Sequence, residues 1–170
     1  ALEYTLKIKI ADIESTSAEV TNAAYYQEIV LKISKTAEKK KESVLLTNVK
    51  DWIFTFMTGV ENSASNSVAG TGTNDVATNG VPFWLTVDFK EVKNVTGVQT
   101  THWGAGYAPS KVEIFSSENG DDWVSIGQWD TKGRTQTITF DERVKTRYLK
   151  YQMITVPSRV DITRFYIYAW

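Results

Sequence analysis

Cysteine is absent from this chain of 170 residues, which excludes a disulfide framework, a thiolate nucleophile and a cysteine-ligated metal. The single histidine leaves no histidine pair with metal-ligand spacing. No apolar run approaches the roughly 20 residues that cross a bilayer. No segment keeps a helical period for long enough to predict an α-helix. The formal net charge is -1, so nothing favours nucleic acid or an anionic membrane as a partner.

Alternation of apolar and polar residues is the strongest pattern that is present. Leu85, Val87 and Phe89 fall on one face of a predicted strand, because side chains along a strand point alternately to its two faces. The same spacing recurs at Val112 and Ile114, at Ile138 and Phe140, at Leu149, Tyr151 and Met153, and at Phe165 and Ile167. Turn residues such as Asn119-Gly120 separate these segments. Short strands at this spacing predict an all-β sandwich or barrel.

The first part of the chain is set apart by its composition. Alternation occurs over residues 2–10 and again over 29–33, and the charged stretch 39–42 follows. That stretch either links two units or is a solvated loop. We therefore expect a β-strand segment over 1–43, which could be the end of a preceding domain, and a sandwich domain over 44–170. Since the chain starts at Ala1 without a signal-peptide pattern, we interpret it as mature or trimmed.

Several motifs in the second part resemble, in order and spacing, those of discoidin domains, also called coagulation-factor C-type or galactose-binding-like domains. Trp84-Leu85-Thr86-Val87-Asp88-Phe89 is similar to the W-x-x-V-D-L strand of that family, and Thr96-Gly97-Val98-Gln99 follows at the usual distance. Ser117-Glu118-Asn119-Gly120-Asp121-Asp122-Trp123 resembles its S-x-D-G-x-x-W hairpin, with Asn in place of Asp. Arg147-Tyr148-Leu149-Lys150-Tyr151 and Phe165-Tyr166-Ile167-Tyr168 resemble its two last strands. The resemblance covers roughly residues 44–170.

This resemblance implies an all-β, jelly-roll β-sandwich whose binding loops cluster at one end, here with a short N-terminal β appendage. Many members bind galactose-type or amino sugars, whereas others bind phospholipid head groups, collagen or cell-surface proteins. Bacterial carbohydrate-binding modules and surface glycan-binding lipoproteins are among them. The resemblance thus implies an extracellular or bacterial cell-surface location, within a larger surface protein or a glycosidase.

One departure from the family concerns its structural calcium ion. The family holds calcium with an Asp and nearby carbonyls, but Asp75 is the single acidic residue within 66–80. Arg164 stands where the family has a late Glu. Calcium requires several oxygen ligands with matching charge, so the residues argue against this metal. We expect no metal and no cofactor; the alternative is a structural calcium ion held in spite of these departures.

The segment from Thr101 to Tyr107 is the best candidate for a sugar site. A sugar site needs an aromatic platform and a few fixed polar groups. Trp103 and Tyr107 offer the rings, and His102 matches the position where sugar-binding relatives often place an Arg or His. The alternative is that both rings cover the end of the core and that His102 is a surface residue or is hydrogen-bonded within the protein.

Other candidates lie in two more loops. Arg159 could bind a pair of hydroxyls or a carboxylate, or it is an ordinary exposed charge. Asn62 and Asn66 belong to the long segment 59–80, where they either face the ligand or are solvated loop residues. Three tryptophans, Trp52, Trp84 and Trp123, we assign to the core.

Catalysis finds little support in the sequence. No G-x-S-x-G motif accompanies His102, and the hairpin motif explains the adjacent carboxylates Asp121 and Asp122. We therefore predict a non-catalytic carbohydrate-binding module that recognises a glycan through loops at one end of the sandwich. The alternatives are a protein- or matrix-adhesion module that uses the same loops, and a purely structural spacer.

Overall fold

The computed structural model describes residues 42–64, 68–69 and 75–170. Nearly all of the segment 1–43, expected to be a β appendage, lies outside the described residues. The elements are β1 (Val44–Leu46), β2 (Ile53–Phe56), β3 (Val76–Thr78), β4 (Trp84–Thr101), the 3-10 turn η1 (Ala105–Tyr107), β5 (Lys111–Ser117), β6 (Val124–Asp130), β7 (Thr135–Thr155), β8 (Val160–Ile162) and β9 (Arg164–Ala169). Over this described range no α-helix forms, which confirms the all-β prediction.

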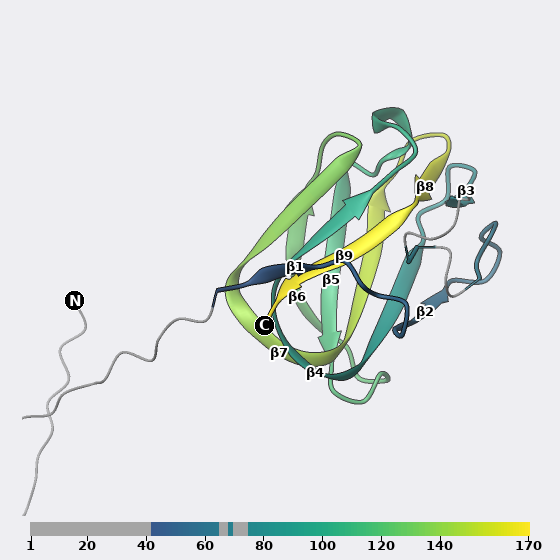
Figure 1. Ribbon diagram of the computed structural model, residues 1–170. Helices are drawn as coiled ribbons and strands as arrows, with labels where there is room; N and C mark the ends of the chain where they lie inside the picture. Colours follow the sequence, from purple (N-terminus) through teal and green to yellow (C-terminus); the bar gives the residue numbers. More distant parts are fainter. Residues whose placement is uncertain (1–41, 65–67, 70–74) are drawn as a thin grey trace, which may run out of the picture. The chain divides into compact units, whose positions relative to one another are not determined.

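Two layers of antiparallel strands share the long strands β4 and β7 (Figure 1). One layer has the order β2-β4-β7-β5-β6 and uses the first part of β4 and the last part of β7. The other has the order β1-β9-β4-β7 and uses the remaining parts of both strands. A short ribbon of β3 and β8 is separate. The predicted jelly-roll β-sandwich is confirmed.

The passage of β4 from one layer to the other depends on local irregularities. Its register against β7 shifts between Asp88 and Lys93 and again between Val95 and Gly97. Lys90 adopts a φ of 68°, a left-handed conformation that turns the chain. A Cβ atom at Gly97 would lie 2.4 Å from the Ile138 carbonyl oxygen, so only glycine fits where the two strands approach.

The core lies between the two layers and is built from alternate residues of the strands. Its fully or almost fully buried members include Leu85, Val87, Val98, Ile114, Ile138, Leu149, Tyr151, Phe165 and Ile167. Burial of one such aliphatic side chain contributes about 1.5–3 kcal/mol. Apart from Val98, these are residues that the alternation placed on one face, so the sequence pattern accounts for this part of the core.

The tryptophans assigned to the core divide into one confirmed and two wrong assignments. Trp52 is buried and packs edge-on against Phe89, with ring centroids 4.8 Å apart. Trp84 is partly exposed on the outer face, because the alternation that buries Leu85 turns its neighbour outward, and Lys150 lies over its ring. Trp123 is also partly exposed, since it ends the turn of the β5–β6 hairpin instead of entering a strand.

Candidate binding site

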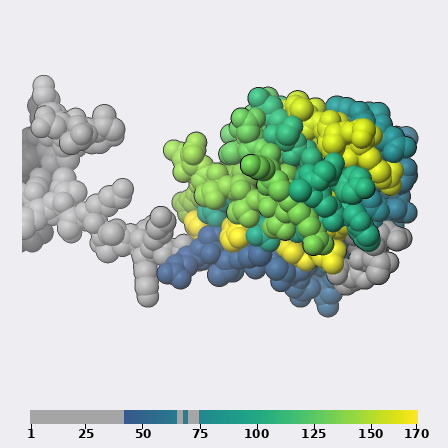
Figure 2. Space-filling view, turned by 90° about the horizontal axis from the view of Figure 1, so that it is seen from above, coloured from purple at the N-terminus to yellow at the C-terminus, as the bar shows by residue number. Residues whose placement is uncertain are grey.

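One end of the sandwich carries the loops in which the candidate residues lie. Thr101 pairs with Thr135 and Lys111 pairs with Thr155, so the loops that follow β4, precede β5 and β7, and follow β7 all leave from this end. Figure 1 shows η1 and β8 together here. In Figure 2, which looks onto this end, segments from distant parts of the chain (blue, green and yellow) adjoin one another. We call this surface the loop rim.

Trp103 has a solvent-exposed ring on a well-anchored backbone. Its side chain is 62% exposed, so it does not close the core. Its N–H donates to Asp161 Oδ1 at 2.9 Å. The preceding residue is fixed as well, because its N–H donates to the Arg134 carbonyl at 2.9 Å and its own carbonyl accepts from Arg134 Nε at 3.1 Å. An exposed ring on a fixed backbone loses little entropy when a ligand stacks on it.

Tyr107 lies on the same loop and is 40% exposed. Its N–H donates to the carbonyl of Gly104 at 3.1 Å, which closes the short turn η1. The loop rim therefore presents two aromatic side chains from a single segment.

His102 is the candidate whose placement departs most from the expectation. Its side chain is fully buried. Nδ1 lies against the backbone carbonyl of Asp161 and must donate to it, since a carbonyl only accepts. Nε2 is then the acceptor for Thr100 Oγ1 at 3.2 Å. Burial lowers the pKa of His102 to about 4, which leaves the ring neutral near pH 7. This corrects the expectation of a ligand contact, because both ring nitrogens are occupied within the protein.

Asp161 is the residue that the sequence reasoning missed. It is 1% exposed, and burial raises its pKa to about 6, an effect that the Trp103 amide partly offsets. Its backbone carbonyl holds His102 while its carboxylate holds the loop backbone. One signal in the sequence could have indicated it: a carboxylate stands between Val160 and Ile162. A charged residue between two buried apolar residues is rarely left without hydrogen-bond partners.

Arg159 lies beside this group in a network of polar side chains. Its guanidinium donates to both carboxylate oxygens of Glu61, at 3.2 Å and 2.8 Å, and to Asn79 Oδ1 at 3.0 Å. The side chain remains partly exposed. Asn62 is exposed and donates to the Asp75 carbonyl at 2.9 Å. Because Ala77 of β3 pairs with Asp161 of β8, this network and the Trp103 loop belong to the same end of the sandwich.

Asn66 lies outside the described residues, so its predicted role stays a prediction. Within the described ranges, no group of three His, Asp or Glu side chains could hold a metal ion. In the same part of the chain, no helix is long and apolar enough to cross a membrane.

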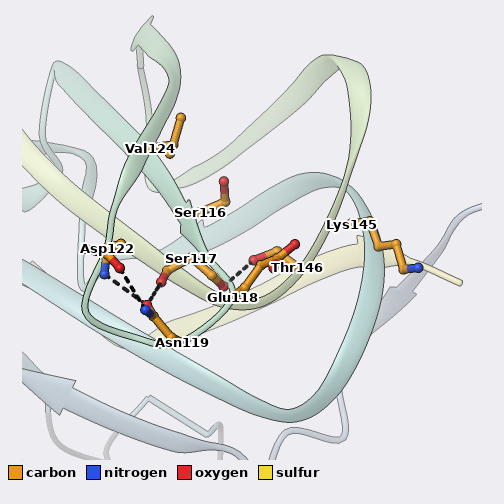
Figure 3. A pocket seen from close by; sticks show the side chains of 8 residues that line it. All are labelled: Ser116, Ser117, Glu118, Asn119, Asp122, Val124, Lys145 and Thr146. Atoms are coloured by element: carbon orange, nitrogen blue, oxygen red, sulfur yellow. Dashed lines mark hydrogen bonds between the residues drawn. The ribbon is translucent and has the colours of Figure 1, made fainter.

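Two hollows lie at the other end of the sandwich. The first has a volume of about 710 Å³ and is lined by Ser116, Ser117, Glu118, Asn119, Asp122, Val124, Lys145 and Thr146 (Figure 3). It contains no aromatic ring, and its polar groups mainly hold the hairpin: Asn119 Oδ1 accepts from the N–H groups of Asp121 and Asp122. The second, of about 610 Å³, lies between β1 and the bend of β4. Neither hollow includes a residue of the loop rim.

The chemistry of the loop rim suits recognition better than reaction. The chain's one histidine is neutral and sealed from solvent, and its hydroxyl partner Thr100 is 1% exposed. Thr100 and His102 could therefore not act as a nucleophile and its base, because neither side chain can reach a substrate. Exposed rings, with a guanidinium, carboxylates and carboxamides at the same end of the sandwich, instead offer stacking surface together with hydrogen-bond donors and acceptors.

Comparison with family models matches residues 55–165 to the F5/8 type C domain. A comparison with curated protein sequences gave no match. Among solved structures, the chain is similar to the family 32 CBM of Clostridium perfringens NanJ in complex with galactose, at 20% identity and a TM-score of 0.58, covering 75% of this chain and 98% of that one. It is also similar to the C-terminal domain of a chitobiase from Bacteroides fragilis, at 16% identity and a TM-score of 0.62, covering 75% of this chain and 98% of that one.

A third similar structure is a CBM32 domain from Clostridium perfringens in complex with GalNAc-beta-1,3-galactose. Its identity is 18% and its TM-score 0.60, with 72% of this chain and 99% of that one covered. At these identities the similarity establishes a shared fold.

Proposed function

The chain belongs to the F5/8 type C domain family, and from this premise we propose that it is a non-catalytic module that binds a carbohydrate through the loop rim. The observation that carries the proposal is the ring of Trp103, exposed on a backbone that Asp161 and Arg134 hold in place. Exposed aromatic rings are the surfaces on which the apolar faces of sugars stack. Two of the similar structures contain bound sugars, which supports this ligand class.

In this proposal each residue of the loop rim has a distinct role. Trp103 is the stacking platform and Tyr107 a second ring beside it. Arg159 and Asn62 supply hydrogen bonds to hydroxyl groups of the ligand. The guanidinium of Arg159 is held in place by its hydrogen bonds to Glu61. His102 and Asp161 make no ligand contact and instead fix the backbone under the platform.

The setting of the module is part of the same proposal. Similar structures come from a family 31 glycoside hydrolase and a chitobiase, which supports a place within a larger glycan-processing or glycan-binding protein. Domains of this family are typical of secreted and surface proteins, which supports a place outside the cell or at a bacterial cell surface. Affinity should be modest, because an open rim orders few groups of the ligand.

The test compares two tryptophan variants on a glycan array. Trp103→Ala should abolish retention of the bound glycan while the circular dichroism spectrum stays unchanged, because the ring contributes little to the core. Trp84→Ala is the matched control, since it removes a partly exposed ring from the outer face of a sheet and should leave retention intact. Full retention by Trp103→Ala would exclude the loop rim as the site.

Repeating the array with and without a chelator shows whether calcium contributes to binding.

The array, together with a retention assay on immobilised proteins, distinguishes carbohydrate binding from adhesion. Absence of any glycan ligand, together with saturable retention on collagen or a cell-surface protein, would reject carbohydrate binding in favour of an adhesion module.

A further inference from the structure

The first part of β7 forms an open edge of its layer. Within the described residues, β7 pairs with β4 alone up to Thr146, whereas its last part pairs with both β4 and β5. Figure 1 shows this first part as the outermost green strand. We call Thr135–Phe140 the edge segment. An edge strand presents unpaired N–H and C=O groups to which another strand can bind.

The direction of these backbone groups follows from two contacts with β4. The Arg134 carbonyl accepts from the His102 N–H, and the Ile138 carbonyl oxygen points at Gly97. Residues 134 and 138 therefore direct their polar groups toward β4. Because this direction alternates along a strand, Thr135, Thr137 and Thr139 direct theirs away from it. The side chains of all three threonines are exposed.

The other described edge strands have features that hinder pairing with a strand of another chain. The edge segment lacks these features. β1, β3 and β8 have three residues each, and β2 has four. β6 has a register shift beside Gly127. The edge segment reads TQTITF, with no charge, no proline and no register shift against β4 from Thr135 to Thr139. Short length, bulges and charge are the means by which proteins protect such edges.

We propose that two copies of this chain pair antiparallel through their edge segments, with Thr137 facing Thr137 across a two-fold axis. In this register Thr135 faces Thr139 of the second copy, so every outward-directed group finds a partner and about six backbone hydrogen bonds form.

Charge at the two ends of the edge segment favours the same arrangement. The exposed cations Lys132 and Arg134 lie at its start, and the exposed carboxylates of Asp141 and Glu142 follow its end. Antiparallel pairing places the cations of one copy beside the carboxylates of the other. A parallel arrangement would instead bring like charges together.

Disulfide trapping tests the register, because the chain contains no cysteine of its own. In the proposed pair, the two copies of Thr137→Cys have Cα atoms about 5.5 Å apart, within the range of a disulfide. Thr139→Cys is the matched control on the same edge and face, but its two copies lie about 14 Å apart. Under mild oxidation, Thr137→Cys should cross-link at least about tenfold faster than Thr139→Cys. Equal rates would overturn the proposal.

Sedimentation of the unmodified chain provides a second, independent measurement. Its mass should approach that of a dimer as the concentration rises to about 1 mM. Thr137→Lys should return it to the monomer, because two cations then face each other, while Thr55→Lys on the exposed edge strand β2 should not. A chain that stays monomeric throughout this range would reject the pairing.

Discussion

Asp161 and His102 make opposite contributions to the pH dependence of stability, and substitution of Asp161 separates them. Burial raises the pKa of Asp161 from 3.8 to about 6. Between these two pH values, Asp161 is therefore protonated in the folded state and ionised in the unfolded state. The contribution of Asp161 to stability is greatest below pH 3.8 and is lost as the pH rises through about 6. Since one pKa unit corresponds to about 1.4 kcal/mol, ionisation of Asp161 lowers the free energy of unfolding by about 3 kcal/mol.

His102 acts in the other direction over nearly the same range. Burial lowers the pKa of His102 from 6.5 to about 4. Between these pH values, His102 is therefore protonated in the unfolded chain and neutral in the folded chain. Its contribution is complete above pH 6.5 and is lost as the pH falls through about 4, again by about 3 kcal/mol. In the unmodified chain the two effects nearly cancel between about pH 4 and pH 6.5.

Asp161→Asn removes the first effect and leaves the second. The carboxamide oxygen still accepts the Trp103 N–H, so the loop keeps its anchor. We expect the variant to be more stable than the unmodified chain by up to about 3 kcal/mol at pH 7, and equally stable near pH 4. Its free energy of unfolding should fall by about 3 kcal/mol between these values, whereas that of the unmodified chain changes little.

Urea unfolding followed by tryptophan fluorescence, repeated across this pH range, measures both free energies. Parallel pH profiles for the two proteins would refute the reasoning, since they would mean that Asp161 does not change its protonation there. The comparison is restricted to values above about pH 4, because the stabilisation from Asp88, whose pKa is about 2, changes with pH mainly below its ordinary value of 3.8.

Two further substitutions test the bend of β4. Gly97→Ala should destabilise the fold by about 1–3 kcal/mol in urea unfolding, because its Cβ would collide with the Ile138 carbonyl; Gly106→Ala, which meets nothing within 4 Å, should have little effect. Arg147→Ala removes the two hydrogen bonds that hold the pKa of Asp88 at about 2. The stability that Asp88 provides is present above pH 3.8 and is lost as the pH falls through about 2. The variant lacks this stabilisation, so its acid unfolding, followed by circular dichroism, should begin at a higher pH than that of the unmodified chain.

The alternation of residues predicted the strands but not their connection between layers. Leu149, Tyr151 and Met153 lie inside the sandwich as their spacing indicated. The pattern could not show that β4 and β7 continue across both layers, because the change of direction depends on the left-handed Lys90 and on register shifts. Such features depend on pairing with a distant strand.

The candidate site was predictable where it depended on local chemistry. The segment from Thr101 to Tyr107 was predicted as the site from its residue types, and Trp103 within it is exposed. The burial of His102 could not be predicted, because its partner Asp161 lies 59 residues further along the chain. Arg159 was predicted as a ligand contact or an exposed charge, and its pairing with Glu61, which spans 98 residues, was not predicted. Contacts at such separations leave no periodic signal in one sequence.

The two strands that run through both layers also decide how the sandwich comes apart. Because β4 and β7 form hydrogen bonds in both layers, opening one layer disturbs strands on which the other depends. The Trp103 loop leaves from the end of β4, where Thr101 pairs with Thr135 of β7, so the position of the exposed ring depends on the same two strands.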